Sequence, residues 1–359
     1  MEINYPPLMV TLELTLRCNA GCLHCGSAAG RERRGELSTG EIIKLIKDLA
    51  NLGVKFITLL GGEPFLRDDW REIAGKIREY GMEISFITNG SLLSQKDVDF
   101  LRDLEPVGIG ISLDGRREIH NAMRRMNLFD SALASLKMLR ENSLLTGIIT
   151  TVTKQNHDLE NLTFLRDLVK SLDLSSWKIQ VGHLTGRMHA DLLLNKEEYY
   201  QLEQWISSQI QGGMTNIAVG DELGYCSSHE QFWRPSPWEW HGCSAGILHM
   251  GICSDGSVKG CLALPDEFIE GNIRASSIVQ IWSEKTNFAY NRNFNSALLE
   301  GHCRDCEVKE QCRGGCRTFN YGFGSLFYSP YCLRVQELEN EMCKRGDEMH
   351  EKNPAAARF

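Results

Sequence analysis

The sequence predicts an α/β protein in which repeated β/α units surround a parallel sheet and a cysteine-rich region follows. Two observations carry this prediction. Short apolar runs rich in β-branched residues alternate with segments of helical period through the first half of the 359-residue chain. The 13 cysteines form two groups, with three before residue 26, ten from residue 226 to residue 343, and none between them.

Six apolar runs have the length and composition of strands. They cover residues 8–15, 54–60, 83–88, 107–113, 146–153 and 177–183. Ser38 with Glu41, and Ser94 with Asp97, have the spacing of helix-capping boxes, and Gly53 stands where the first helix must end. Six parallel strands with outer helices fit either an open doubly wound sheet or a barrel, and periodicity does not separate the two.

The composition restricts the class of protein. A formal charge of −8 argues against nonspecific nucleic-acid binding. The N-terminus lacks a basic region followed by a long apolar run, and no stretch approaches about 18 uninterrupted apolar residues. We therefore expect a cytoplasmic protein with neither a nucleic acid nor a membrane as partner. Without a secretory signal, many cysteines indicate metal binding and not disulfides.

The segment CNAGCLHC places Cys18, Cys22 and Cys25 close together. Three thiolates leave one iron of a four-iron cluster open for another ligand. A closed zinc site would need a fourth ligand, and His24 is the nearest candidate, but ligands adjacent in sequence rarely both reach one tetrahedral metal. A disulfide pair is disfavoured by the expected compartment.

This cysteine spacing resembles the signature of the radical S-adenosylmethionine (SAM) family. The resemblance implies a partial (β/α)6 barrel whose cluster loop follows the first strand, as CNAGCLHC follows residues 8–15 here. It also implies that the open iron binds the amino and carboxylate groups of SAM. Reductive cleavage of SAM then gives a 5′-deoxyadenosyl radical, which abstracts a hydrogen atom from the substrate.

Further SAM contacts are expected where the strands end, because parallel β/α folds form their sites there. After the second strand, Gly61, Gly62, Glu63 and Pro64 match the family's methionine-binding motif, although a tight turn alone also explains a Gly-Gly-Glu-Pro sequence. The remaining candidates are polar residues at other strand ends and in the cysteine loop. They are Thr88, Asn89, Ser112, Gln180 and His24. For Asn89, turn chemistry is an equal alternative, since Asn-Gly is a turn dipeptide.

The second cysteine region has a longer pattern. It consists of Cys243, twelve residues, Gly256, four residues and Cys261, then C-x2-C-x5-C-x3-C, then a last cysteine. A lone pair of C-x2-C units would fit a zinc ribbon, but seven cysteines in this order resemble the SPASM domain, a C-terminal extension of radical SAM enzymes that modify peptides. The resemblance implies that Cys303, Cys306, Cys312 and Cys332 hold one auxiliary cluster.

The same resemblance assigns Cys243, Cys261 and Cys316 to the other auxiliary cluster. Cys253 lies across an expected Asp-Gly hairpin and is a candidate fourth ligand, the alternative being an open site. Cys226 is by default a free buried thiol. If it faces the cavity, it is a candidate catalytic hydrogen-atom donor.

These features predict a small cysteine-rich SPASM domain at residues 241–345, after a barrel at 1–194 and a helical bridge at 195–240, with a tail at 346–359. We expect a radical SAM peptide maturase with SAM and three 4Fe-4S clusters. It would modify a ribosomal precursor peptide, by oxidative crosslinking through a thioether or carbon–carbon bond. A flavodoxin or ferredoxin would supply electrons, and a separate leader-peptide recognition protein is a candidate partner. The alternatives are a peptide epimerase, a dehydrogenase of a small molecule and a non-enzymatic iron-sulfur electron-transfer protein.

Overall fold

The computed structural model describes residues 6–233 and 242–340. One sheet of ten strands has the order β10-β9-β8-β1-β2-β3-β4-β5-β6-β7. Its central strands are β1 (Met9–Glu13), β2 (Phe56–Leu60), β3 (Glu83–Thr88), β4 (Gly108–Ser112), β5 (Thr146–Val152) and β6 (Ser176–Val181). They are parallel and coincide with the six predicted runs, so that prediction is confirmed.

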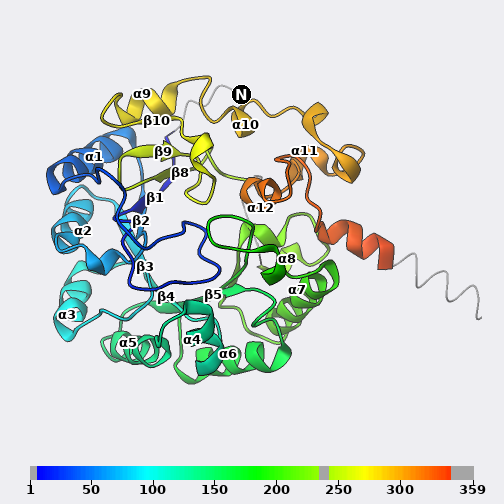
Figure 1. Ribbon diagram of the computed structural model, residues 1–359, viewed down its shortest axis with the longest axis horizontal. Coiled ribbons are helices and arrows are strands. Elements are labelled where there is room, and N and C mark those ends of the chain that lie inside the picture. The colour runs from blue at the N-terminus through cyan, green and yellow to red at the C-terminus, as the bar shows by residue number, and fades with distance from the viewer. Residues whose placement is uncertain (1–5, 234–241, 341–359) are drawn as a thin grey trace, which may run out of the picture.

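Helices follow one another around the outside of these strands (Figure 1). They are α1 (Thr39–Leu52), α2 (Trp70–Glu79), α3 (Gln95–Leu104), α4 (Arg117–Arg124), α5 (Phe129–Glu141), α6 (Leu159–Ser171) and α7 (Lys196–Gln211). Both predicted capping boxes are present, at Ser38 with Glu41 and at Ser94 with Asp97. Gly53 ends α1 with a φ of 100°, in the left-handed region that favours glycine.

Successive side chains along each strand face either the hydrophobic core or a cavity. Leu12, Leu59 and Phe86 are buried in the large hydrophobic cluster that includes the inner sides of the helices. Each such side chain contributes about 1.5–3 kcal/mol by leaving water. Residues that alternate with these along the strands, such as Thr11 and Thr58, line a cavity. The edge strands β10 and β7 do not pair with each other in the described residues, so the barrel is partial.

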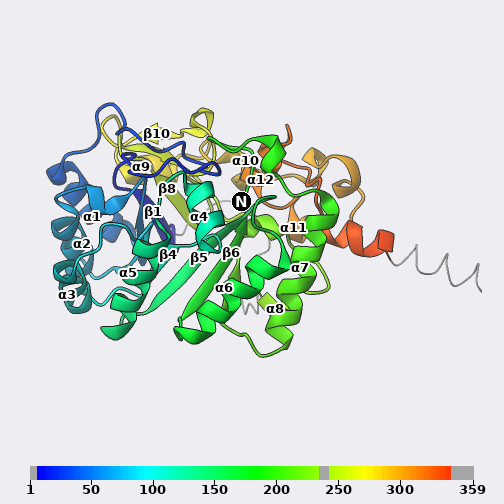
Figure 2. The ribbon, with the colours of Figure 1, turned by 60° about the horizontal axis from the view of Figure 1, so that its bottom comes forward.

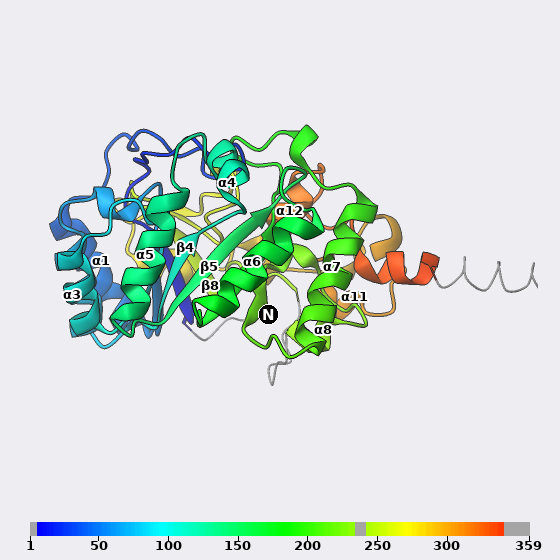
Figure 3. The same cartoon turned by 90° about the horizontal axis from the view of Figure 1, so that it is seen from below.

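The segment predicted as a helical bridge, residues 195–240, adds a strand to the barrel sheet. It contains α7 and the short α8 (Glu230–Trp233), which lie near each other in Figure 3, but it also contains β7 (Ile217–Val219). β7 pairs parallel with β6 and extends the sheet by one strand. Sequence reasoning missed this strand because three residues are too few to show a period.

The cysteine-rich region is joined to the barrel by the sheet itself. β8 (His249–Ile252) pairs parallel with β1. β9 (Ser257–Lys259) and β10 (Gly271–Asn272) then continue the sheet in antiparallel fashion, with the expected Asp255–Gly256 turn between β8 and β9. The remaining helices are short. They are α9 (Ile278–Ser283), α10 (Ala289–Arg292), α11 (Lys309–Cys312), α12 (Arg317–Tyr321) and a helical stretch at residues 333–340.

The predicted tail at 346–359 and Cys343 lie outside the described residues. In the part of the chain that the structure describes, no helix combines the length and the apolar character needed to cross a lipid bilayer.

Candidate active site

The first three cysteines lie in a loop that follows β1, which we call the triplet loop (residues 14–30). Its two ends are joined by backbone hydrogen bonds from Cys18 N to Gly30 O (3.0 Å) and from Gly30 N to Leu16 O (3.0 Å). The loop lies over the carboxyl ends of the strands (Figure 2). Cys18, Cys22 and Cys25 all line the same central cavity, whose volume is about 650 Å³.

Neighbouring elements hold the triplet loop in place. Leu23 N donates to Met123 O (2.9 Å), at the end of α4. Arg187 reaches the loop from beyond β6, where its Nε donates to Cys22 O (2.9 Å) and its Nη1 donates to Ala29 O (2.6 Å). The loop is therefore fixed by the barrel on two sides, with its thiols turned into the cavity.

The donors around these thiols fit a metal cluster. Ala20 N donates to Cys18 Sγ (3.4 Å) and Ala29 N donates to Cys25 Sγ (3.4 Å), a contact that favours thiolate. Burial nevertheless raises the pKa of Cys18 to about 11, so the free thiol stays protonated. Iron would supply the positive charge that a buried thiolate needs. Among the described residues no disulfide joins these cysteines.

The Gly-Gly-Glu-Pro segment lies directly against the start of the triplet loop. A Cβ on Gly61 would stand 2.2 Å from Thr15 O, and one on Gly62 would stand 2.2 Å from Arg17 O. Gly62 N and Glu63 N donate to those two carbonyl oxygens, at 2.7 and 2.8 Å. Only glycines permit this approach, which lines the cavity with bare backbone.

Glu63 is fully buried under the cavity floor, where Pro64 begins a 3-10 helix (Pro64–Leu66). Its carboxylate accepts hydrogen bonds from Thr88 Oγ1 (2.7 Å) and from Asn89 N (2.8 Å). Burial raises the pKa of Glu63 to about 7 despite these bonds. The structure therefore gives Thr88 and Asn89 a task that the sequence did not show, which is to orient Glu63.

A buried charged group supports the loop from α4 and β4. Asp114, which is fully buried, accepts a hydrogen bond from Arg124 Nε (2.6 Å), and Arg124 Nη1 contacts Cys22 Sγ (3.6 Å). The Arg124 guanidinium holds the pKa of Asp114 well below its usual range, although burial opposes it. His24 Nε2 lies 3.7 Å from Asp114, and burial lowers the pKa of His24 to about 4, so its ring is neutral.

The other predicted SAM contacts face the same cavity. His24, Ser112 and Gln180 are all among its lining residues. Gln180 Nε2 donates to Thr151 Oγ1 (3.0 Å), which fixes its amide at the wall. The structure thus brings every predicted SAM-binding residue except the buried Glu63 and Pro64 onto the cavity surface, and their contacts with SAM remain predictions.

A second part of the cavity wall carries Cys243, Cys261 and Cys316, which we call the auxiliary triad. The charges of Cys243 and Cys261 act on each other, as do those of Cys243 and Cys316. Burial raises the pKa of Cys261 to about 11, and it also raises the pKa of Cys316 well above its usual value. Like the first triplet, these thiols need a cation in order to ionise, and together they could hold a second cluster.

Glu222 is a cavity residue that sequence reasoning missed. It belongs to a 3-10 turn (Asp221–Leu223) after β7, and it lines the cavity beside the auxiliary triad. Its Oε2 is buried and has no hydrogen-bond partner among the described residues. Its charge raises the pKa of Cys316 and of Cys261. If the auxiliary triad holds a cluster, Glu222 would be in a position to offer it an oxygen ligand.

Cys253 lies away from the auxiliary triad. In the β8–β9 hairpin Ile252 pairs with Val258, so Cys253 stands opposite Ser257, and its N–H accordingly donates to Ser257 O (2.8 Å). Cys253 is absent from the cavity lining and instead faces the charges of Lys259 and Glu13. This geometry disfavours Cys253 as the fourth ligand.

The distal group, which comprises Cys303, Cys306, Cys312 and Cys332, does not line the central cavity. The charge of Cys312 acts on both Cys303 and Cys332, so these thiols are neighbours. Cys226 lies beside Cys312, whose hydrogen bond lowers the pKa of Cys226, and it does not line the central cavity. This position disfavours a hydrogen-atom donor in the cavity and makes Cys226 a fifth thiol of the distal group.

Comparison with known proteins gives matches to both halves of the chain. The model of the radical SAM superfamily matches residues 12–165, and the model of the iron-sulfur cluster-binding domain called SPASM matches residues 243–307. Both named resemblances from the sequence are therefore confirmed. They indicate iron-sulfur clusters and SAM as the groups that the protein binds.

Relatives with two different names align along most of the chain. The AdoMet-dependent heme synthase of Methanosarcina barkeri is 29% identical over 91% of this chain and 96% of its own length. The mycofactocin maturase MftC of Mycobacterium tuberculosis is 28% identical over 89% of this chain and 80% of its own. Crystal structures of Streptococcus suis SuiB with S-adenosylmethionine and with the precursor peptide SuiA share the fold. Each has a TM-score of 0.75, with 19% and 18% identity, and covers 92% of this chain and 78% or 76% of SuiB.

Proposed function

Since this chain belongs to the radical SAM proteins with a SPASM domain, we propose that it is a maturase that modifies a ribosomally synthesised peptide. One observation carries the proposal: the triplet loop and the auxiliary triad line a single cavity of about 650 Å³. A cavity of this size holds a ligand such as SAM together with one side chain of a substrate. A substrate C–H bond placed there would lie between the two metal sites.

The chain's own residues would position SAM. Gly61 and Gly62 present bare backbone beside the triplet loop, where the methionine part of SAM would lie. The Glu63 carboxylate would attract the amino group, with Thr88 and Asn89 keeping it oriented. Ser112 and Gln180 would contact the rest of the ligand. The cluster at the triplet, once reduced, would supply a 5′-deoxyadenosyl radical from SAM.

We propose three 4Fe-4S clusters, at the triplet, the auxiliary triad and the distal group. The triad lines the cavity and the distal group does not, which suits removal of an electron from a substrate radical toward the surface. Loss of that electron would complete an oxidative crosslink, through a thioether or a carbon–carbon bond. A flavodoxin or ferredoxin would deliver the first electron, and a separate protein would recognise the leader peptide.

A second function, the modification of an iron porphyrin, is favoured by one observation. The relative named AdoMet-dependent heme synthase aligns with 96% of its own length, a larger share than the 80% of the maturase MftC. A peptide and a porphyrin need different sites. A porphyrin is a flat, largely apolar macrocycle that fits a slot, whereas a peptide has a polar backbone. The central cavity is lined by polar residues such as Lys178 and Gln180 and by apolar ones such as Leu60 and Ile87, so it suits either substrate and the choice is left to the experiment.

The two functions are separated by one set of incubations. The anaerobically reconstituted protein is mixed with SAM and a reductant, and then either with a short peptide encoded beside its gene or with an iron porphyrin. We expect 5′-deoxyadenosine, together with a peptide that has lost two hydrogens by mass spectrometry. A peptide mass that is unchanged in ordinary water but increases through deuterium uptake in heavy water would mean epimerisation. A changed porphyrin with an unaltered peptide would overturn the proposal. The triple variant C18A, C22A and C25A is the control.

A further inference from the structure

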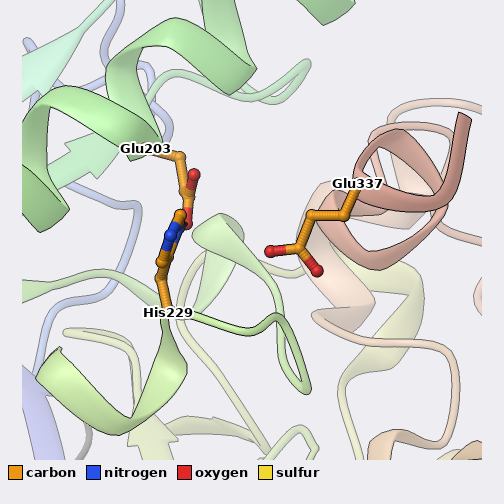
Figure 4. Close-up of side chains that lie close together, drawn as sticks. All are labelled: Glu203, His229 and Glu337. Carbon is orange, nitrogen blue, oxygen red and sulfur yellow. Dashed lines mark hydrogen bonds and ion pairs between the residues drawn. The ribbon is translucent and has the colours of Figure 1, made fainter. Parts of the chain in front are cut away.

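Three potential metal ligands meet on the outer side of the barrel, away from the central cavity. Glu203 comes from α7, His229 from the loop before α8, and Glu337 from the helical stretch at 333–340. One ligand atom from each lies within 4.8 Å of the other two (Figure 4). None of the three lines the cavity that holds the cysteines. The cluster is therefore separate from the radical SAM site.

Glu203 is the unusual member because its side chain is fully buried. Its Oε1 lies 2.6 Å from His229 Nδ1. Its Oε2 is also buried and has no hydrogen-bond partner among the described residues. A buried carboxylate oxygen is normally paired, so this free oxygen indicates that a group absent from the protein chain completes the site.

Glu337 adds a second carboxylate to the same place. It accepts hydrogen bonds from Ser228 N (3.0 Å) and Ser228 Oγ (2.7 Å), which hold it beside His229. Its charge raises the pKa of Glu203 further, although burial is the larger cause. Neither lysine nor arginine is among the described groups that act on the Glu203 carboxyl. Two carboxylates facing one imidazole leave an excess of negative charge that a cation would balance.

We propose that Glu203, His229 and Glu337 bind one divalent transition-metal ion of the Zn²⁺ type. Imidazole nitrogen and carboxylate oxygen are ligands that Zn²⁺ accepts at about 2.0–2.2 Å. Ligand atoms in such a tetrahedron lie roughly 3.4 Å apart, so small side-chain rotations from the present spread of 4.8 Å would close the site. Water would fill the fourth position.

The ion would act as a structural staple between three elements. It would join α7 and the loop before α8, which belong to the barrel side, to the helical stretch that directly follows Cys332. Cys332 is the last member of the distal group. Binding of Zn²⁺ would therefore fix the end of the cysteine-rich region on the barrel, without contact to SAM or to the clusters.

Calorimetric titration of Zn²⁺ into the anaerobic holoprotein, with all clusters loaded, tests this proposal. We expect about one tight equivalent per chain and a higher unfolding temperature in its presence. E337Q and H229Q should each weaken binding by about tenfold or more. E337Q changes a partly exposed residue and keeps its shape, so folding is preserved even if E203Q fails to fold. E197Q, an exposed carboxylate on the same helix α7, is the matched control and should bind Zn²⁺ as the wild type does.

Co²⁺ identifies the ligands, because thiolate ligation gives an intense near-ultraviolet charge-transfer band and ligation by nitrogen and oxygen does not. We expect weak visible bands only, and we expect E337Q and H229Q to remove them. Three results would each overturn the proposal: no Zn²⁺ uptake beyond the clusters, uptake that both variants leave unchanged, or a thiolate band with Co²⁺. In those cases Glu203 and His229 form a simple hydrogen-bonded pair.

Discussion

The two walls of the central cavity are built in different ways. The triplet loop is tied to regular barrel elements, by backbone bonds to the end of α4 and by Arg187 from beyond β6. The auxiliary triad lies in a region of short helices and turns, where buried arginines take the place of regular backbone pairing. Arg317, which is fully buried, donates from its Nη1 to Arg313 O (2.7 Å) and Leu326 O (2.8 Å).

Arg292 has a similar role on the second wall, since its Nε donates to Gly246 O (2.7 Å) and its Nη1 to Trp282 O (2.6 Å). This difference teaches that the protein preorganises the SAM-side wall, while the auxiliary wall depends on long-range contacts, to which the proposed clusters would add. Metal binding to such a region contributes directly to its folding.

The largest expected effect compares one cysteine from each wall. C18A should abolish formation of 5′-deoxyadenosine, because the SAM-binding iron site loses a ligand. C316A should retain SAM cleavage and lose peptide modification, because only the auxiliary cluster is affected. Each variant should lose about four irons per chain. Deoxyadenosine and product are measured by liquid chromatography with mass spectrometry, and equal loss of SAM cleavage in both variants would break the distinction between the walls.

The next effect concerns the support of the first wall. R124M should lower the free energy of unfolding by about 3–5 kcal/mol, because it leaves the fully buried Asp114 without its partner. R117Q on the same helix α4 breaks an exposed pair with Asp130 and should cost at most about 1 kcal/mol. Urea unfolding of the anaerobic protein, followed by circular dichroism, measures both. Equal, small effects would show that the buried pair does not brace the loop.

A smaller effect is the pH dependence of SAM binding. Because burial raises the pKa of Glu63 to about 7, the carboxylate that attracts the amino group is mostly protonated below that pH. The affinity for SAM should therefore rise about tenfold from pH 6 to pH 8. E63Q should bind weakly and without this pH dependence, while E72Q, an exposed residue of α2, should keep it. Equilibrium binding across this range is the measurement, and a flat profile in the wild type would contradict the expected role.

The smallest effect sharpens the description of the second wall. E222Q should raise the reduction potential of the cluster at the auxiliary triad, on the order of tens of millivolts, because a negative charge next to the cluster is lost. E300Q, an exposed residue of the same region, should leave the potential unchanged. Potentiometric titration followed by electron paramagnetic resonance measures the shift. An unchanged potential in E222Q would remove Glu222 from the surroundings of this cluster.

Much of the barrel could be predicted because its signals are local. The six central strands and the boxes at Ser38 and Ser94 depend on residues a few positions apart. The pairing of β8 with β1 joins residues about 240 positions apart, and no local pattern encodes it. For the same reason, the predicted domain boundary at residue 241 gave no sign that strands before it and strands after it belong to one sheet.

The site residues also fall into those that short motifs predict and those that depend on tertiary packing. Cysteine spacing and Gly-Gly-Glu-Pro identified the cavity-lining residues of the first wall, since each motif is one short loop. The Asp114–Arg124 pair, Glu222 and the position of Cys226 beside Cys312 depend on tertiary packing. The Asp-Gly hairpin that suggested Cys253 as a ligand is present, but the turn does not show that Cys253 is absent from the cavity lining.

The parallel contact between β8 and β1 also has a consequence for biosynthesis. Until residues 249–252 have left the ribosome, one side of β1 carries backbone groups with no neighbour. An open, apolar strand edge invites pairing with other nascent chains. A truncated polypeptide that stops before this strand should therefore precipitate, even though it contains every motif needed to capture SAM.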